Sequence, residues 1–104
     1  MYYDKIDDLK NKIVETGQPE RIILFGSYAQ GTATEDSDVD FLVIGPSSLS
    51  RRERERHFIR ALFGSGVPYD LIALTPEEVE ARLRVRGPFL QEILSTGKVI
   101  YQRE

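Results

Sequence analysis

The chain has no cysteine and a single histidine, His57, among its 104 residues. Without cysteine it can form no disulfide, thiolate nucleophile or cysteine-bound zinc site, which is typical of a protein from a reducing cytoplasm. One histidine cannot build a multi-histidine metal site, and we assign His57 no catalytic role. Whatever chemistry the protein performs must therefore depend on oxygen ligands.

The chain also lacks a long apolar run and an excess of positive charge. No apolar run approaches the roughly 18 to 20 residues of a membrane span, and residues 1–10 show neither the basic nor the apolar part of an export signal. We therefore expect a cytoplasmic protein without membrane association. Its 17 acidic residues outnumber 14 Lys and Arg, which gives a net charge of -3. This sign is wrong for holding nucleic acid by bulk electrostatics, so direct nucleic-acid binding is not expected.

Short apolar segments closed by glycine or proline predict the strands of the protein. They lie at residues 21–25, 38–44 and 68–74, with a weaker fourth at 98–101. Apolar spacing of three and four residues, together with two capping boxes, predicts the helices. A first helix ends at residue 17, and a second runs from residue 50 to about 63. A third runs from 75 to the break at Gly87-Pro88, and a fourth covers about 89–94. The hydrophobic content of 40% suits one core, so we expect one domain over residues 1–104.

The order of strand, helix and strand over residues 38–74 determines the expected fold class. Such a crossover connection places its two strands in one sheet as parallel neighbours. We therefore predict an α/β or α+β fold, in which helices flank a small mixed β-sheet.

Three aspartates are the candidate catalytic and metal-binding residues. Asp38 and Asp40 lie two apart on a predicted strand, so their side chains leave the same face with Cα atoms about 6.5 to 7 Å apart. Asp70 lies near the start of the predicted neighbouring strand. Three close carboxylates raise one another's pKa, so the arrangement favours a bound divalent cation. Because no His or Cys is near, Mg²⁺ or Mn²⁺ is expected, and two such ions could activate a hydroxyl and stabilise a leaving pyrophosphate.

A Gly-Ser pair supplies the candidate phosphate-binding residues. Gly26 follows a buried strand directly, where a glycine lets a phosphate approach the backbone. If Ser27 starts a short helix, its hydroxyl and the helix amides would meet an anion. Gly31 and Ser37 are further nucleotide-binding candidates, with a turn glycine and a local loop cap as the alternative interpretations. The pattern predicts a site of phosphoryl or nucleotidyl transfer.

The motif GSYAQG at residues 26–31, followed by SDVD at residues 37–40, carries a family resemblance. It resembles the Gly-Ser and Asp-x-Asp signature of the DNA polymerase β-like nucleotidyltransferase superfamily. With its short length and Asp70 following a helix, the chain is similar to the minimal nucleotidyltransferases, the MNT family. The resemblance covers most of the chain and implies the polymerase β-like nucleotidyltransferase fold.

The resemblance also implies a role for each motif residue. Gly26 and Ser27 would contact the β- and γ-phosphates of the incoming nucleoside triphosphate, and Asp38 and Asp40 would bind the metals. Asp70 would ligate the catalytic metal and help to deprotonate the acceptor hydroxyl.

The chain departs from the family at residue 30. Many members carry Arg where this chain has Gln30. One possible positive charge on the phosphate side is therefore missing, which bears on catalytic rate and leaves the metal site intact.

The family further implies a protein partner. Minimal nucleotidyltransferases commonly pair with HEPN-domain toxins, and the MNT antitoxin can transfer AMP to a tyrosine of the toxin. We therefore expect a Mg²⁺-dependent enzyme that uses ATP and forms a hetero-oligomer with a HEPN-type toxin. Two alternatives remain: a non-catalytic antitoxin that masks the toxin by binding it, and a nucleotidyltransferase that acts on a small molecule.

The charged run at residues 51–56 alternates arginine and glutamate. Its acids stand three or four residues from arginines, the spacing of helical ion pairs. This pattern favours a salt-bridged solvent face over an RNA-binding patch.

Overall fold

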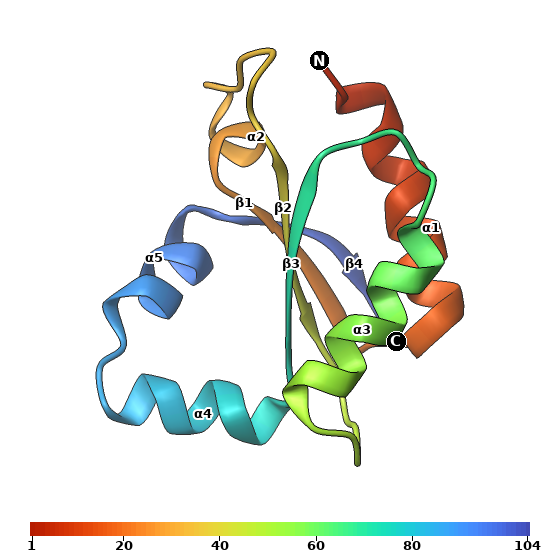
Figure 1. Cartoon of the computed structure of the whole chain (residues 1–104). Helices are drawn as coiled ribbons and strands as arrows, with labels where there is room; N and C mark the ends of the chain where they lie inside the picture. The colour runs from red at the N-terminus through yellow and green to blue at the C-terminus, as the bar shows by residue number, and fades with distance from the viewer.

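The computed structural model describes all 104 residues, and its strands form one four-stranded sheet with the order β3-β2-β1-β4 (Figure 1). The strands are β1 (Arg21–Phe25), β2 (Val39–Ile44), β3 (Tyr69–Leu74) and β4 (Lys98–Gln102). The helices are η1 (Tyr3–Lys5), α1 (Ile6–Gly17), α2 (Ser27–Gln30), α3 (Arg51–Leu62), α4 (Pro76–Arg84) and α5 (Pro88–Thr96). Each predicted strand and helix is present, and α2 is a short helix in the segment that follows β1.

The sheet is mixed. β1 is antiparallel to both β2 and β4, whereas β2 and β3 are parallel. The parallel pair is joined by α3, as a crossover connection requires. The predicted fold class and the predicted pairing of β2 with β3 are therefore confirmed.

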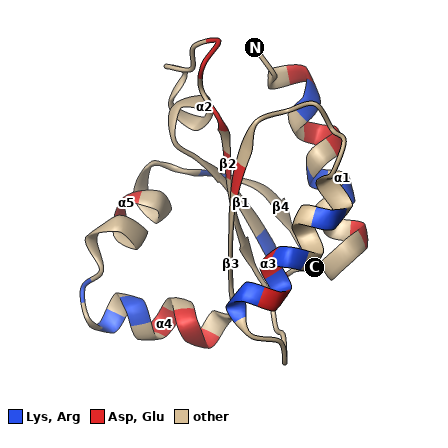
Figure 2. Ribbon diagram, viewed as in Figure 1, with Lys and Arg blue, Asp and Glu red and all other residues tan.

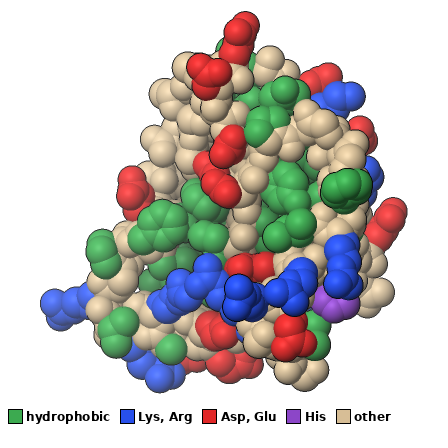
Figure 3. All heavy atoms as spheres, viewed as in Figure 1, with side chains coloured by type: hydrophobic (Ala, Val, Ile, Leu, Met, Phe, Trp, Pro, Cys, Tyr) green, Lys and Arg blue, Asp and Glu red, His purple; other side chains and the backbone are tan.

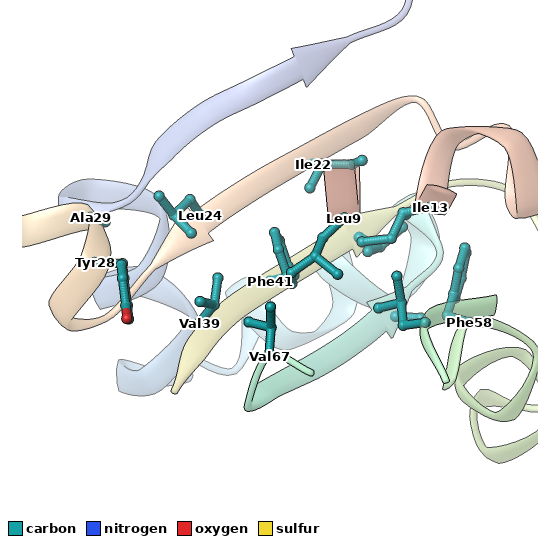
Figure 4. Close-up of a cluster of buried hydrophobic side chains, with 13 residues drawn as sticks. Leu9, Ile13, Ile22, Leu24, Tyr28, Ala29, Val39, Phe41, Phe58 and Val67 are labelled. Carbon is teal, nitrogen blue, oxygen red and sulfur yellow. The ribbon is translucent and has the colours of Figure 1, made fainter. Parts of the chain in front are cut away.

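Helices cover both faces of the sheet. In Figure 1, α1 and α3 lie on one side, and α4 and α5 lie on the other. A cluster of 13 buried residues, among them Leu9, Phe41 and Phe58, fills the α1 and α3 side (Figure 4). A cluster of 6, including Leu42 and Ile93, fills the other side. Burial on both faces explains why β2 is a continuous apolar run after Asp40.

The helix starts follow the predicted capping chemistry. The hydroxyl of Ser50 accepts a hydrogen bond from the Glu53 N–H at 3.2 Å. Thr75 and Glu78 form the complete reciprocal capping box at the start of α4. These caps satisfy backbone donors that the first turn of a helix leaves free, which fixes where α3 and α4 begin.

One expectation for the charged run at residues 51–56 is wrong. Arg54 is buried, with only 7% of its surface exposed, although Arg51 pairs with Glu55 on the helix surface as predicted. The Arg54 guanidinium donates to the Ala73 carbonyl at 2.8 Å and forms an ion pair with Glu78. The sequence pattern of α3 did not reveal this because both partners lie about twenty residues further along the chain.

None of the helices combines the length and the apolar character that crossing a membrane would require.

Candidate active site

The aspartates lie where β2 and β3 begin. Asp40 on β2 is in direct register with Asp70 on the parallel strand β3. Leu42 and Ile72, two residues further along each strand, pack into the cluster on the α4 and α5 side. Because side chains two apart share a face, Asp40 and Asp70 project on that same side. Figure 2 shows acidic residues next to each other at this end of the two strands.

Asp38 lies just before the start of β2, because the strand begins at Val39. It is exposed, as is Asp70, whereas Asp40 is partly buried. Acidic side chains reach the surface at this end of the sheet (Figure 3). The site is therefore open to solvent on the side of Asp38 and Asp70, with Asp40 set deeper.

The three carboxylates act on one another electrostatically. Burial, and after it the nearby negative charges of Asp70 and Asp38, together raise the pKa of the Asp40 carboxyl to about 6. The expected mutual repulsion of the acids is thus present at Asp40. A cation next to Asp40 would reverse this penalty, since opposite charge favours the ionised carboxylate.

The aspartates nevertheless do not form a preassembled metal cluster, because no three acidic or histidine side chains are gathered to hold an ion. The chemistry of the donor set fits Mg²⁺ or Mn²⁺, since every candidate ligand is a carboxylate oxygen. The backbone fits as well: a Cβ at position 26 would collide with Oδ2 of Asp40, so only glycine leaves that carboxylate its place.

The Gly-Ser turn connects β1 to α2. Gly26 has φ 72° and ψ -155°, a conformation that is accessible essentially to glycine alone. Its carbonyl accepts from the N–H groups of Ala29 and Gln30, and Ser27 is the first residue of α2. Ser27 thus starts a short helix directly after a buried strand, which is the condition under which its hydroxyl and the helix amides would meet an anion.

The turn and the aspartates are brought together by strand register. Phe25, the residue before Gly26, is the antiparallel partner of Asp40. Phe25, Asp40 and Asp70 therefore form one row across three neighbouring strands. The two motifs lie side by side in the fold, as a site for phosphate and metal requires.

The other two candidate residues have local structural roles. Gly31 is the C-cap of α2 with φ 75°, a left-handed conformation that favours glycine whether or not a ligand is bound. The Ser37 hydroxyl accepts a hydrogen bond from the Thr34 N–H at 2.8 Å, within the loop that precedes Asp38. These contacts order the connection between α2 and β2 and so position Asp38.

Sequence reasoning missed two aromatic residues at this site, Phe25 and Phe89. Phe25 was assigned to a buried strand and Phe89 to the apolar face of a helix, but both rings line a cavity that reaches Gly26. The only sequence signal was the position of Phe25 next to the Gly-Ser pair.

The chain is similar to known proteins in sequence and in fold. The family model of the nucleotidyltransferase domain matches residues 6–99. A Methanocaldococcus jannaschii protein, named as a candidate protein adenylyltransferase, is 38% identical over 89 residues, which are 80% of this chain and 58% of that protein. The chain thus spans under two thirds of the length of this relative.

A second protein of Methanocaldococcus jannaschii with the same descriptive name is 30% identical over 98 residues, 92% of this chain and 90% of its own length. A crystal structure of a toxin-antitoxin with AMP-PNP superposes with a TM-score of 0.60 at 27% identity, covering 95% of this chain and 75% of that chain. Family match, identity and fold agree with the paired motifs, and the chain belongs to the nucleotidyltransferase domain family.

Proposed function

We propose that the protein is a Mg²⁺-dependent adenylyltransferase that transfers AMP from ATP to a hydroxyl of a partner protein. The observation that carries this proposal is the direct register of Asp40 with Asp70 next to the Gly26 turn. Two acids and a glycine that leaves space for one of them suit a metal-bound triphosphate. We assign Gly26 and Ser27 to the phosphates, and Asp38, Asp40 and Asp70 to two metal ions.

The reaction forms one bond and breaks one. The acceptor oxygen attacks the α-phosphorus of ATP, a P–O bond forms to the AMP group, and the bond to pyrophosphate breaks. Asp70, which is exposed at the start of β3, accepts the proton of the hydroxyl. When bound, Mg²⁺ supplies charge neutralisation for the phosphates and lowers the pKa of the attacking hydroxyl. Gly26 has no side chain, so it leaves the Asp40 carboxylate its place and would let the triphosphate approach it.

The relatives support ATP as the nucleotide and a protein as the acceptor. Three relatives at 30% to 38% identity are named as candidate protein adenylyltransferases. The toxin-antitoxin structure at 27% identity holds AMP-PNP, an ATP analogue. We therefore propose a toxin as partner, of the HEPN type that the MNT resemblance implies, with a tyrosine as acceptor. The pair would form a hetero-oligomer in the cytoplasm, and AMP transfer would neutralise the toxin.

A second candidate function is neutralisation of the toxin by binding alone. Two observations favour it: the three carboxylates are not gathered into a metal cluster, and residue 30 is the neutral Gln30. Under this alternative the nucleotide site would be vestigial.

Intact-mass spectrometry distinguishes the two functions. The protein is incubated with Mg²⁺, each nucleoside triphosphate in turn, and the product of the neighbouring gene as the candidate partner. The adenylyltransferase adds the mass of AMP to the partner with ATP, and the double variant Asp38→Asn and Asp40→Asn adds none. An unmodified partner whose activity is still suppressed would favour masking, and modification by the double variant would refute the assigned site.

A further inference from the structure

A small cavity lies between β1, α2 and α5, next to the Gly-Ser turn. Its volume is about 220 Å³, and its apolar lining comes from Phe25, Phe89 and Ile93. Gly26 also lines it, so the cavity is continuous with the proposed phosphate site. Because Phe25 pairs with Asp40, the cavity borders the row of catalytic aspartates.

Phe89 presents an aromatic ring to solvent at this cavity. It is 57% exposed on the first turn of α5, although the chain buries most of its large apolar side chains. Its ring meets Phe25 edge to face, with centroids 6.1 Å apart and an interplanar angle of 89°. In this geometry Phe89 is held from one side by Phe25, and a ring face of Phe89 remains available to a ligand.

The polar lining of the cavity differs in kind from the triphosphate site. The Thr96 hydroxyl is committed to the Glu92 carbonyl at 2.8 Å. Gln30 and Glu92 are exposed and supply an amide and a carboxylate. A carboxylate only accepts hydrogen bonds, and an amide both donates and accepts. No Lys or Arg lines the cavity, and the Glu92 carboxylate would repel a phosphate there.

We infer that this cavity holds the base of the bound nucleotide, stacked on Phe89, while the triphosphate lies at Gly26 and Ser27. Aromatic side chains bind bases by stacking, and a purine offers the larger ring face. Glu92 accepts from an exocyclic amine, which favours adenine over uracil. The inference deepens the proposed function and rests on it in one respect, since ATP is taken as the ligand.

The volume of the cavity agrees with this assignment. Pockets for drug-sized ligands measure about 300 to 1,000 Å³. A cavity of about 220 Å³ is smaller, which suits one ring system whose sugar and phosphates lie outside it. The neighbouring Gly26 turn is where those phosphates are proposed to bind, so one nucleotide would span both features.

The test compares the binding of two probes, ATP and inorganic tripolyphosphate, each with Mg²⁺, by titration calorimetry and without any partner protein. Phe89→Ala is expected to weaken ATP binding about 5- to 150-fold, the effect of losing one base–aromatic stacking contact. Tripolyphosphate binding is expected to stay unchanged, because tripolyphosphate has no base. Phe89→Tyr keeps the ring and is expected to bind ATP as the original chain does.

Phe63→Ala is the matched control, since Phe63 is 88% exposed at the end of α3 on the opposite side of the sheet. It should change neither affinity. The preference for ATP over UTP should also shrink in Phe89→Ala. Equal loss of ATP and tripolyphosphate affinity, full ATP affinity in Phe89→Ala, or no ATP binding by the original chain would each overturn the inference.

The outcomes separate this inference from the proposed function. If ATP binding depends on Phe89 but no partner becomes modified, the base site stands and protein adenylylation does not. If the partner is modified while Phe89→Ala binds ATP normally, adenylylation stands and the base site does not.

Discussion

Asp40 on β2 lies in direct register with Asp70 on β3, and this pairing places two carboxylates side by side at an open end of a parallel strand pair. Neighbouring parallel strands lie about 5 Å apart, so like charges at paired positions repel. Apolar residues follow this unfavourable pair on both strands, so the two carboxylates are the charged exception in this part of the sheet. The cation site proposed for these aspartates would account for such a pair.

Asp40→Asn should stabilise the metal-free protein at neutral pH. The folded-state pKa of Asp40 is about 6, against an ordinary value of 3.8, so ionisation costs stability as the pH rises from about 4 through 6. Above that range the amide should raise the free energy of unfolding by about 1 to 2 kcal/mol, after allowance for partial exposure. Urea unfolding at pH 7 and pH 4 measures this.

The gain should vanish at pH 4, where the carboxyl is protonated in the folded protein. Asp36→Asn, an exposed loop substitution, is the control and should change stability at neither pH. A variant Asp40→Asn that is no more stable than the original chain at pH 7 would contradict the repulsion inferred at this site.

Mg²⁺ or Mn²⁺ should make the original chain more stable than Asp40→Asn, the reverse of the order expected without metal. Bound cation offsets the repulsion around Asp40, and a ligand that binds only the folded state raises the melting temperature. The original chain should therefore melt higher with each millimolar step of Mg²⁺, and Asp40→Asn and Asp70→Asn should respond weakly or not at all. Thermal melts with matched NaCl separate this effect from ionic strength. An equal response in Asp40→Asn would remove Asp40 from the metal site.

Gly26→Ala and Gly31→Ala should differ in their effect on ligand affinity, although both substitutions strain the backbone. Each glycine has a positive φ, so an alanine costs stability, by about 1 to 3 kcal/mol at Gly26 and about 1 kcal/mol at Gly31. At Gly26 the new methyl also collides with Oδ2 of Asp40, whereas at Gly31 it meets nothing within 4 Å. Tripolyphosphate and Mn²⁺ titrations should show lost affinity in Gly26→Ala alone. Equal losses in both variants would indicate a general effect of backbone strain.

Local patterns predicted most of the fold and both motifs. Strand runs, capping boxes and the Gly-Ser and Asp-x-Asp pairs are each contained within a few residues, so the sequence revealed them directly. The burial of Arg54 was missed because its partners lie in later elements: Ala73 in the edge strand β3 and Glu78 in α4. The meeting of Phe25 with Phe89 was missed for the same reason, since it depends on how α5 packs on β1. Contacts between residues far apart in the chain produce no periodic pattern that can be recognised in a single sequence.

Glu78→Gln should destabilise the protein above about pH 4.5 and have little effect near pH 2. The hydrogen bond from Arg54 is the main cause that lowers the pKa of Glu78 from 4.5 to about 2. A lowered carboxyl pKa contributes stability above its unfolded value, and this contribution is lost as the pH falls from about 4.5 to about 2. Because the Glu78 side chain is 38% exposed, we expect a loss near 1 kcal/mol at pH 7.

Glu80→Gln is the matched control on the same helix. Glu80 pairs with Arg84 at 3.1 Å, but both side chains are about two-thirds exposed, so its removal should cost less than about 0.5 kcal/mol. Urea unfolding across pH 2.5 to 7 should therefore show a widening gap between the original chain and Glu78→Gln as the pH rises, and a small gap for Glu80→Gln. Equal costs would mean that Arg54, despite its burial, holds Glu78 no more firmly than a surface arginine holds its partner.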